Sequence, residues 1–216
     1  VFGQALADRV EVFPGISYTT FLVPGLVMMS VIQNAFANSS SSLIQSKVTG
    51  NLIFILLAPV STLEFFAAFV AAAVVRGVLV GGGILAAAVW FVPVPVYSVG
   101  ITLLFAALGA AVLGVLGIIA GVWAQKFDQL AGFQNFIILP LSFLSGVFYS
   151  IHSLPSFWQV ASHLNPFFYM IDGFRYGFFG AADVSPWVSL AVVAAFLLGL
   201  SAFTLEWLRR GYRLRD

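Results

Sequence analysis

The sequence predicts an all-α membrane protein, a polytopic bundle of helices that cross a lipid bilayer. Of its 216 residues, 61% are hydrophobic and 8% are charged, whereas a soluble domain has about 25% charged residues. The mean hydropathy is +1.06. Long uncharged stretches separate the few charges, and each is long enough for the roughly 20 apolar residues that a membrane-spanning helix needs.

The composition also excludes several classes of protein. A water-soluble globule with this much apolar surface would aggregate, so we exclude a soluble enzyme, a disordered protein and a nucleic-acid-binding domain. The chain has no cysteine, which excludes disulfides, cysteine-based zinc sites and thiol chemistry. The apolar runs are too continuous for the alternating strands of an outer-membrane barrel.

Five spans are predicted in this chain. Helices are the element that satisfies its own backbone groups in lipid, and Pro93 and Pro95 indicate a short turn between the second and third spans. The predicted spans are Tyr18–Asn38, Phe65–Val92, Val96–Ala124, Leu130–Tyr149 and Pro186–Leu208.

The positions of Lys and Arg predict the orientation, because cytoplasmic loops are enriched in these residues. If the C-terminus is cytoplasmic, six of them fall on that side, two fall outside and Arg76 lies within the membrane. The six are Lys47, Lys126, Arg209, Arg210, Arg213 and Arg215, and the two are Arg9 and Arg175. Five spans place Val1 outside, and a preceding span would return the true N-terminus to the cytoplasm.

Arg76 lies near the centre of the second predicted span, where an arginine costs roughly 3 kcal/mol on insertion scales. Two interpretations are open. Arg76 contacts another helix or a substrate path, or backbone carbonyls or a water defect satisfy it without a role in transport. On the same helix Gly81–Gly83, and on the next Gly117 and Gly121, predict close helix packing, either static or moving during transport.

The segment 39–63 is predicted to be cytoplasmic. Its serine-rich start, Asn38–Ser42, is expected to break the first span. Lys47–Leu57 is predicted as a short helix that ends at Ala58-Pro59, because the residue before a proline is driven out of the helical region. This helix either docks a soluble partner or is an ordinary loop against lipid headgroups.

The segment 150–184 is predicted to lie outside, too interrupted to cross the membrane. Ser156–Leu164 and Phe167–Phe179 are predicted as two short helices, each started by a proline. Asp172 and Arg175 are three residues apart, so they share a helix face and are able to pair. The two helices either dip into the outer leaflet as a re-entrant gate or only anchor the bundle at the interface.

The chain shows no catalytic or metal motif. His152 and His163 are its only histidines, and without a clustered carboxylate or cysteine they make a poor metal site. No G-x-S-x-G motif and no G-x-x-x-x-G-K-[ST] phosphate loop occurs. Any ATP that drives this protein is therefore bound by another polypeptide. No polar lining is evident in the spans.

Three stretches are distinctive in combination. They are FLVPGLVMM at 21–29, LLAPV at 56–60 and LPLSFLSGVFY at 139–149, the last continued by Leu154-Pro155, Trp158, Leu164–Pro166, Tyr169 and Gly173–Gly177. Together they resemble the bacterial type-2 ABC exporter permeases of the inner membrane. The likeness covers nearly the whole chain, and in the third stretch the prolines, asparagine and arginine fall at the family's spacing.

The resemblance implies one transmembrane domain over residues 1–216, with six spans in the full-length protein. The family's N-terminal interface helix and first span are then expected before this chain. The resemblance also implies a homodimer of permeases in membrane lipid, with separate ATPase subunits that bind ATP and Mg and no cofactor in this chain. The expected location is the bacterial inner (cytoplasmic) membrane, multi-pass, with a cytoplasmic C-terminus.

The same resemblance assigns roles to residues. It makes 47–57 the coupling helix that meets the ATPase and the outer helices a gate; Arg76 is the intramembrane candidate. The coupling residues are Lys47, Asn51, Leu52, Leu56, Leu57 and Pro59, and the gate residues are Pro140, Ser145, Gly146, Phe148, Pro155, Trp158, Asn165, Pro166, Tyr169, Asp172 and Arg175. Relatives commonly carry acidic residues where this chain has Ile53-Phe54-Ile55, a departure that leaves a less charged coupling surface.

The function implied is that of a permease subunit of an ATP-driven exporter for a lipid-like, drug or glycan substrate, with no ATPase site of its own. The alternative is a secondary transporter or channel. Such proteins often show internal repeats or intramembrane carboxylates for proton coupling, and this sequence shows neither. No nucleic-acid partner is expected.

Overall fold

The computed structural model describes residues 16–57 and 59–210, and the regular elements found there are helical, which confirms the predicted all-α class. In chain order the elements are α2 (Tyr18–Val48), α3 (Leu52–Leu57), α4 (Thr62–Ala88), α5 (Val99–Trp123), α6 (Phe127–Phe133), the π-helix η1 (Gln134–Ile138), α7 (Leu139–Phe143), the 3-10 helix η2 (Ile151–Ser153), α8 (Ser156–His163), α9 (Pro166–Phe179) and α10 (Pro186–Arg209).

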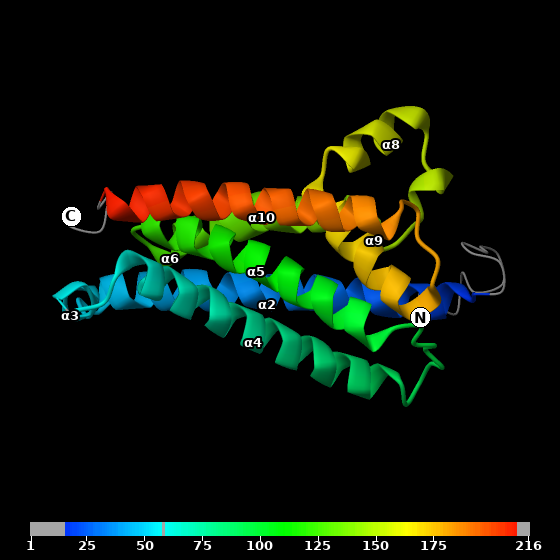
Figure 1. The fold of residues 1–216 in the computed structure, drawn as a ribbon, viewed down its shortest axis with the longest axis horizontal. Helices are drawn as coiled ribbons and strands as arrows, with labels where there is room; N and C mark the ends of the chain where they lie inside the picture. Colours follow the sequence, from blue (N-terminus) through cyan, green and yellow to red (C-terminus); the bar gives the residue numbers. More distant parts are fainter. Residues whose placement is uncertain (1–15, 58, 211–216) are drawn as a thin grey trace.

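Within the described residues, α2, α4, α5 and α10 are the helices long and apolar enough to cross a membrane. They lie alongside one another on the long axis of the molecule, with α5 between the others (Figure 1). More than half of the residues in the apolar parts of α2 and α5 are buried, whereas few of those in α4 and α10 are. Four of the five predicted spans therefore have a continuous helix.

The remaining predicted span, Leu130–Tyr149, is a broken helix. α6, η1 and α7 follow one another directly, and the helix ends at Phe143. Pro140 explains the break, because its ring removes one backbone N–H and crowds the carbonyl four residues earlier. The π-turn just before it is one of the ways in which a helix accommodates such a residue. A fifth crossing by this helix stays a prediction.

The predicted break at the serines of the first span is wrong, because α2 continues to Val48. The Ser40 hydroxyl donates to the carbonyl of Phe36 at 2.8 Å, and the Ser39 hydroxyl donates to the carbonyl of Phe69 at 3.5 Å. Both serines are buried. Since their hydroxyls find acceptors, they do not interrupt the helix. The predicted helix over 47–57 is correspondingly shorter, and only α3 is helical after a turn.

Side-chain caps and prolines set where several helices begin. The Ser61 hydroxyl accepts the N–H of Glu64, whose carboxylate in turn accepts the N–H of Ser61, a reciprocal cap that starts α4. α9 begins at Pro166 and α10 at Pro186, positions at which proline suits the first turn. The two short helices predicted in the segment 150–184 are thus present as α8 and α9, and their place on the outer side stays a prediction.

Small residues bring α2 and α5 together. A Cβ added to Gly117 would lie 2.6 Å from the carbonyl oxygen of Phe36, and one added to Gly121 would lie 2.8 Å from Cβ of Leu43. Glycine is required at such distances, since a side chain would force the helices apart. The predicted close packing is confirmed at these two positions.

Candidate functional site

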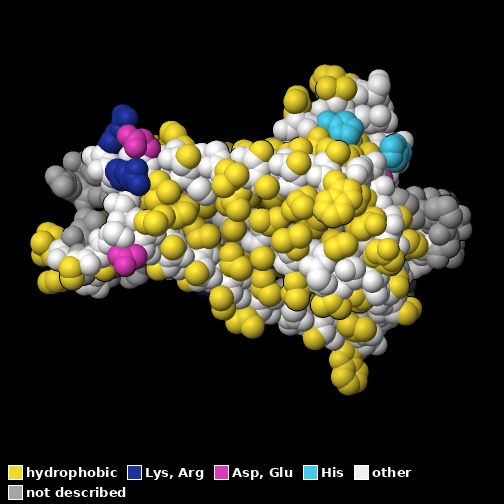
Figure 2. Space-filling model, in the orientation of Figure 1, with side chains coloured by type: hydrophobic (Ala, Val, Ile, Leu, Met, Phe, Trp, Pro, Cys, Tyr) yellow, Lys and Arg dark blue, Asp and Glu magenta, His cyan; other side chains and the backbone are white. Residues whose placement is uncertain are grey.

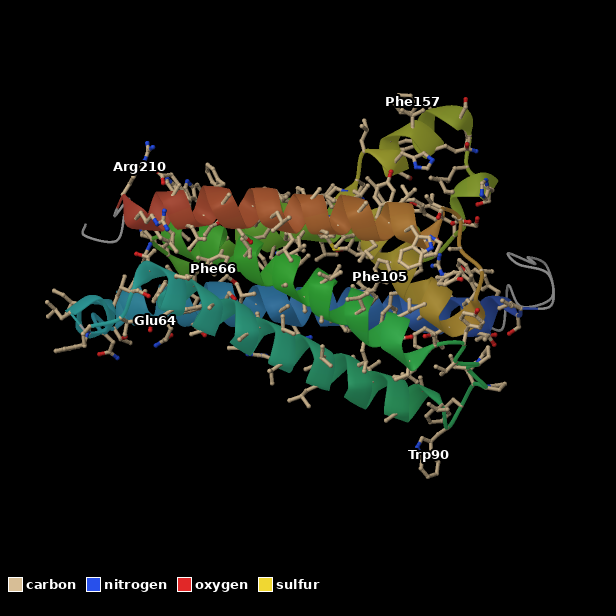
Figure 3. All side chains as sticks on the ribbon, viewed as in Figure 1. Glu64, Phe66, Trp90, Phe105, Phe157 and Arg210 are labelled. Atoms are coloured by element: carbon tan, nitrogen blue, oxygen red, sulfur yellow. The ribbon has the colours of Figure 1, made fainter. Side chains whose placement is uncertain are left out.

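The molecule has two chemically different ends. On the face seen in Figure 2, Lys, Arg, Asp and Glu gather at the end where α10 finishes, and the histidines lie at the opposite end. Apolar side chains cover the length between them. Glu64 and Arg210 both lie at the charged end, on different helices (Figure 3). α3 is at this end as well (Figure 1), so the two candidate regions, coupling and gate, are at opposite ends of the bundle.

α3 presents an apolar face outward. Leu52 is buried and anchors the helix, with 6% of its surface exposed, whereas Ile53, Phe54 and Leu57 are 60%, 70% and 77% exposed. Sequence reasoning named Leu52 and Leu57 but treated Ile53 and Phe54 only as a departure from the family. Ile53 and Phe54 follow Leu52 directly, so they face outward once Leu52 is known to be buried. The sequence alone does not show that burial.

Lys47 is turned inward. Its ammonium donates to the backbone carbonyls of Val122 and of Ala124, the latter at 3.2 Å. These carbonyls belong to the end of α5, where helical partners are lacking. Lys47 therefore satisfies the C-terminus of α5 and contributes favourable charge there.

The other coupling candidates are placed less specifically. Asn51 and Pro59 are exposed on either side of α3. The side chain of Leu56 lies outside the described residues, as do Arg9, Arg213 and Arg215, which entered the prediction of orientation.

Arg76 lies in the middle of α4 on an exposed face, and its guanidinium donates to the side-chain oxygen of Asn38 on α2 at 3.4 Å. This bond is a contact to another helix of the same chain, and a place of Arg76 on a substrate path stays a prediction. An exposed arginine at mid-span is costly in lipid unless it faces protein or a water-filled cavity.

Asn38 belongs to a row of polar side chains that sequence reasoning missed. The polar face of α2 consists of Ser30, Gln33, Asn34, Asn38, Ser41 and Gln45. All six are half-buried or exposed. Apart from the adjacent pair Gln33 and Asn34, they recur three or four residues apart, which places them on one side of the helix. The spacing is visible in the sequence, but the predicted helix break at Asn38–Ser42 interrupts the row.

At the opposite end, Arg175 of α9 is fully buried and joins three parts of the chain. Its guanidinium donates to the carbonyl of Gly146, after α7, at 2.7 Å. The same group lies over the ring of Phe21 on α2, 3.9 Å from the ring centre. Both contacts favour a buried guanidinium. Gly146 itself has φ of +77°, a conformation that suits glycine.

Asp172 does not form the predicted close ion pair with Arg175. Its carboxylate instead accepts the N–H groups of Asp183 and Val184, at 2.8 and 3.1 Å. The carboxylate therefore holds the connection between α9 and α10.

Asp183 extends this arrangement to η2. Its carboxylate accepts the hydroxyl of Ser150 and, at 3.1 Å, the N–H of Ile151. His152 lies 3.9 Å from the same carboxylate, whereas His163 is near Tyr169. The two histidines are thus not brought together, and the described residues contain no group of three His, Cys, Asp or Glu that could hold a metal.

Asn165 ties α7 to α9. Its amide donates to the carbonyl of Leu141 at 2.7 Å, and its oxygen accepts the N–H of Phe167, capping α9 just before Pro166. This bond brings Asn165 and Pro166 close to the helix that contains Pro140.

Other gate candidates surround this centre. The Tyr18 hydroxyl donates to the carbonyl of Phe148 at 3.1 Å, and the Ser145 hydroxyl donates to the carbonyl of Ser142. Pro155 and Trp158 lie at the exposed start of α8, and the structure does not bring them to the buried centre.

These features define a polytopic membrane protein with an apolar helix at its charged end, a polar row along one span and a buried polar network at its other end. The model of the ABC-2 type transporter family matches residues 1–179. The inner membrane transport permease YadH of Escherichia coli (strain K12) is 41% identical over all 216 residues, which cover 84% of that relative. YadH of Shigella flexneri is equally similar.

Nodulation protein J of Rhizobium leguminosarum bv. trifolii is 27% identical over 180 residues, 80% of this chain and 66% of the relative. The chain belongs to the ABC-2 type transporter family. It is a membrane permease subunit of an ABC transporter of the inner membrane, and it is not itself the ATPase.

Proposed function

We propose that this chain forms the translocation path of an ATP-driven exporter, built from two copies of the permease and separate ATPase subunits that bind ATP and Mg²⁺. One observation carries the proposal. The apolar face of α3 and the buried network around Arg175 lie at opposite ends of the same continuous helices. This arrangement suits a machine in which an ATPase acts at one end and a gate opens at the other, as ATP stabilises one of two states.

The α3 end is the cytoplasmic end in this proposal. Lys47, Lys126 and Arg210 lie at that end, together with Arg209, whereas the described cation at the other end, Arg175, is buried. This distribution follows the enrichment of positive charge on the cytoplasmic side. The C-terminus is then cytoplasmic as well.

The gate consists of α8 and α9, dipping into the outer leaflet as a re-entrant pair. α8 projects away from the bundle (Figure 1), and its Phe157, Val160 and Leu164 are well exposed. Phe157 points outward (Figure 3). Exposed apolar side chains of this kind suit contact with lipid or with a second copy. Asn165 and Gly180 cap the two ends of α9, as a helix within the membrane requires.

The substrate path runs along the polar face of α2, with Arg76 beside it. Amides and a guanidinium at membrane depth are unfavourable against lipid, so a second permease copy is expected to cover this face. A lipid-like, drug or glycan substrate with hydrogen-bonding groups would find donors and acceptors there.

Co-purification tests the proposal. The full-length permease is expressed with a candidate ATPase subunit, purified in nanodiscs and compared with Phe54→Ser and with the matched control Phe157→Ser at the opposite end. Burial of a phenylalanine stabilises an interface by roughly 1.5–3 kcal/mol. We therefore expect Phe54→Ser to weaken ATPase binding about tenfold or more, and Phe157→Ser to leave it unchanged. A permease that binds no ATPase and moves solute along an ion gradient would instead be a secondary transporter.

A further inference from the structure

The inner ends of α2 and α5 are joined through Lys47. The lysine belongs to the last turn of α2, and the carbonyls of Val122 and Ala124 that it bonds belong to the end of α5. The final carbonyls of a helix have no partner within the helix. The cation therefore fastens one helix end to the other.

α3 is attached to the same joint. The N–H of Gly50 donates to the carbonyl of Lys47 at 3.1 Å, and Gly50 has φ of +72°, which lets the chain turn sharply into α3. Leu52 of α3 is buried in one apolar cluster with Leu43 of α2 and Val122 of α5. A force on the exposed side of α3 therefore acts on α2 and α5 together.

α5 is a continuous helix between the two ends of the molecule. It contains 25 residues, which is roughly 37 Å at 1.5 Å per residue. It contains no proline, and it packs against α2, α4, α9 and α10. A helix that is braced on several sides moves as a rigid body rather than bending.

The outer end of α5 is locked to α9 by backbone hydrogen bonds. The N–H of Ser98, which caps α5, donates to the carbonyl of Gly177 at 2.8 Å. The N–H of the preceding Tyr97 donates to the carbonyl of Phe178 at 3.1 Å. A shift of α5 along its axis therefore pulls on the last turn of α9.

Close packing adds to this connection. A Cβ added to Gly177 would lie 2.8 Å from the backbone nitrogen of Thr102, and one added to Gly173 would lie 2.1 Å from the ring of Phe105. α5 thus fits directly against the backbone of α9, and the two helices cannot slide freely past each other.

We infer that α5 carries a displacement of α3 to α9, and that Lys47 is the positioning residue that engages α5 at the inner end. The inference rests on the proposed coupling role of α3. Coupling between distant sites travels through packed, rigid elements that have two arrangements. α9 holds Arg175 and Asp172, so its displacement changes the bonds to Gly146 and to the α9–α10 connection.

The test uses the full-length permease with its ATPase subunit in nanodiscs. This chain has no cysteine, so a single introduced cysteine is labelled specifically. Leu164→Cys lies between α8 and α9 and is 81% exposed. An environment-sensitive fluorophore is attached to it before the ATPase is added. Two quantities are measured for each variant. They are ATPase co-elution, and the fluorescence change on addition of MgATP and vanadate.

Three lysine variants separate positioning from docking. Lys47→Met removes the bonds to α5, and Lys47→Arg keeps a cation able to donate to carbonyls. Lys126→Met is the matched control, because Lys126 is exposed at the same end and makes no side-chain cap of α6. We expect Lys47→Met to retain ATPase binding but to lose the fluorescence change by about fivefold or more, the low end of ordinary coupling between sites. Lys47→Arg and Lys126→Met are expected to behave as the unchanged protein.

The contrary results are distinct. A Lys47→Met complex that keeps the full fluorescence change overturns the inference and leaves the proposed function standing. Loss of ATPase binding in Lys47→Met, with Lys47→Arg also defective, makes Lys47 a docking residue and overturns the inference. Failure of the unchanged permease to bind any ATPase overturns the proposed function, and the inference with it.

Discussion

At the residue scale, Arg175 shows how a buried charge organises the outer end. Removing a guanidinium from water is costly unless its donors and its charge find partners. Arg175 finds the carbonyl of Gly146 for one N–H and the face of Phe21 for its charge, whereas its buried Nε has no hydrogen-bond partner among the described residues. Arginine suits this place because its planar group donates at its edge while its face stacks on a ring, which a lysine cannot imitate.

Arg175→Met is therefore expected to destabilise the permease by about 1–3 kcal/mol, since it leaves the carbonyl of Gly146 without its donor in a buried place. Arg210→Met is the control, because Arg210 is exposed and its 2.8 Å pair with Glu206 is worth at most about 1 kcal/mol. Thermal unfolding in detergent, followed by intrinsic tryptophan fluorescence, compares the two. Equal melting temperatures for both variants would contradict the role of Arg175.

At the element scale, the close approach of α2 and α5 depends on glycine rather than on large apolar side chains. Without a hydrophobic force between helices in lipid, packing contacts hold them together. The backbone of α5 reaches the carbonyl of Phe36 at Gly117. Any side chain there separates the helices over several turns.

Gly117→Ala is expected to lower stability by about 1–3 kcal/mol through overpacking. Gly199→Ala on α10 is the matched control, because nothing lies within 4 Å of its added Cβ. The apparent melting temperature of each purified variant decides the matter: a decrease in Gly117→Ala alone agrees with the packing, and the same shift in both does not.

The elements also show what the sequence could reveal. The long helices, the proline-started helices α8 and α9 and the glycine packing were predicted, because each depends on residues close in sequence or on composition. The continuation of α2 was not, because Ser39 and Ser40 are buried by the rest of the bundle, and the acceptor of Ser39, the carbonyl of Phe69, is distant in the chain.

The candidate site was predicted only in part for the same reason. Asn165 and Arg175 were named as gate candidates, but their acceptors, Leu141 and Gly146, depend on the fold. The carboxylate of Asp172 accepts the loop N–H groups of Asp183 and Val184 rather than pairing with the arginine one turn away. The helical spacing of the two residues does not distinguish these two arrangements. Lys47 was named as a coupling candidate, but its bonds to the end of α5 were not predicted.

At the scale of the whole molecule, the proposed function places the charged end and the α8–α9 end on opposite sides of the membrane. The charge distribution indicates which side is which, and α3 and α8 provide exposed positions for a direct test. Leu57 is 77% exposed on α3, and Leu164 is 81% exposed at the end of α8.

This chain has no cysteine. A membrane-impermeant maleimide therefore reacts only with an introduced cysteine on the side to which the reagent is added, and it reports the side on which each position lies. We expect Leu164→Cys to react in intact spheroplasts and Leu57→Cys to react only in inverted vesicles, because positive charge is retained inside. Labelling in the reverse order would invert the assigned orientation and place α3 away from any cytoplasmic ATPase.

The π-turn of η1 has a further consequence for the broken helix. A π-turn inserts the equivalent of one extra residue, and one residue corresponds to about 100° of rotation in a helix with 3.6 residues per turn. α6 and α7 therefore differ in rotational phase. The inner half is aligned with α2 through the stacked rings of Phe36 and Phe133, and the outer half with α9 through Leu141 and Asn165. If 3.6 residues per turn are assumed throughout η1, the direction of the side chains in the outer half is wrong by about 100° of rotation.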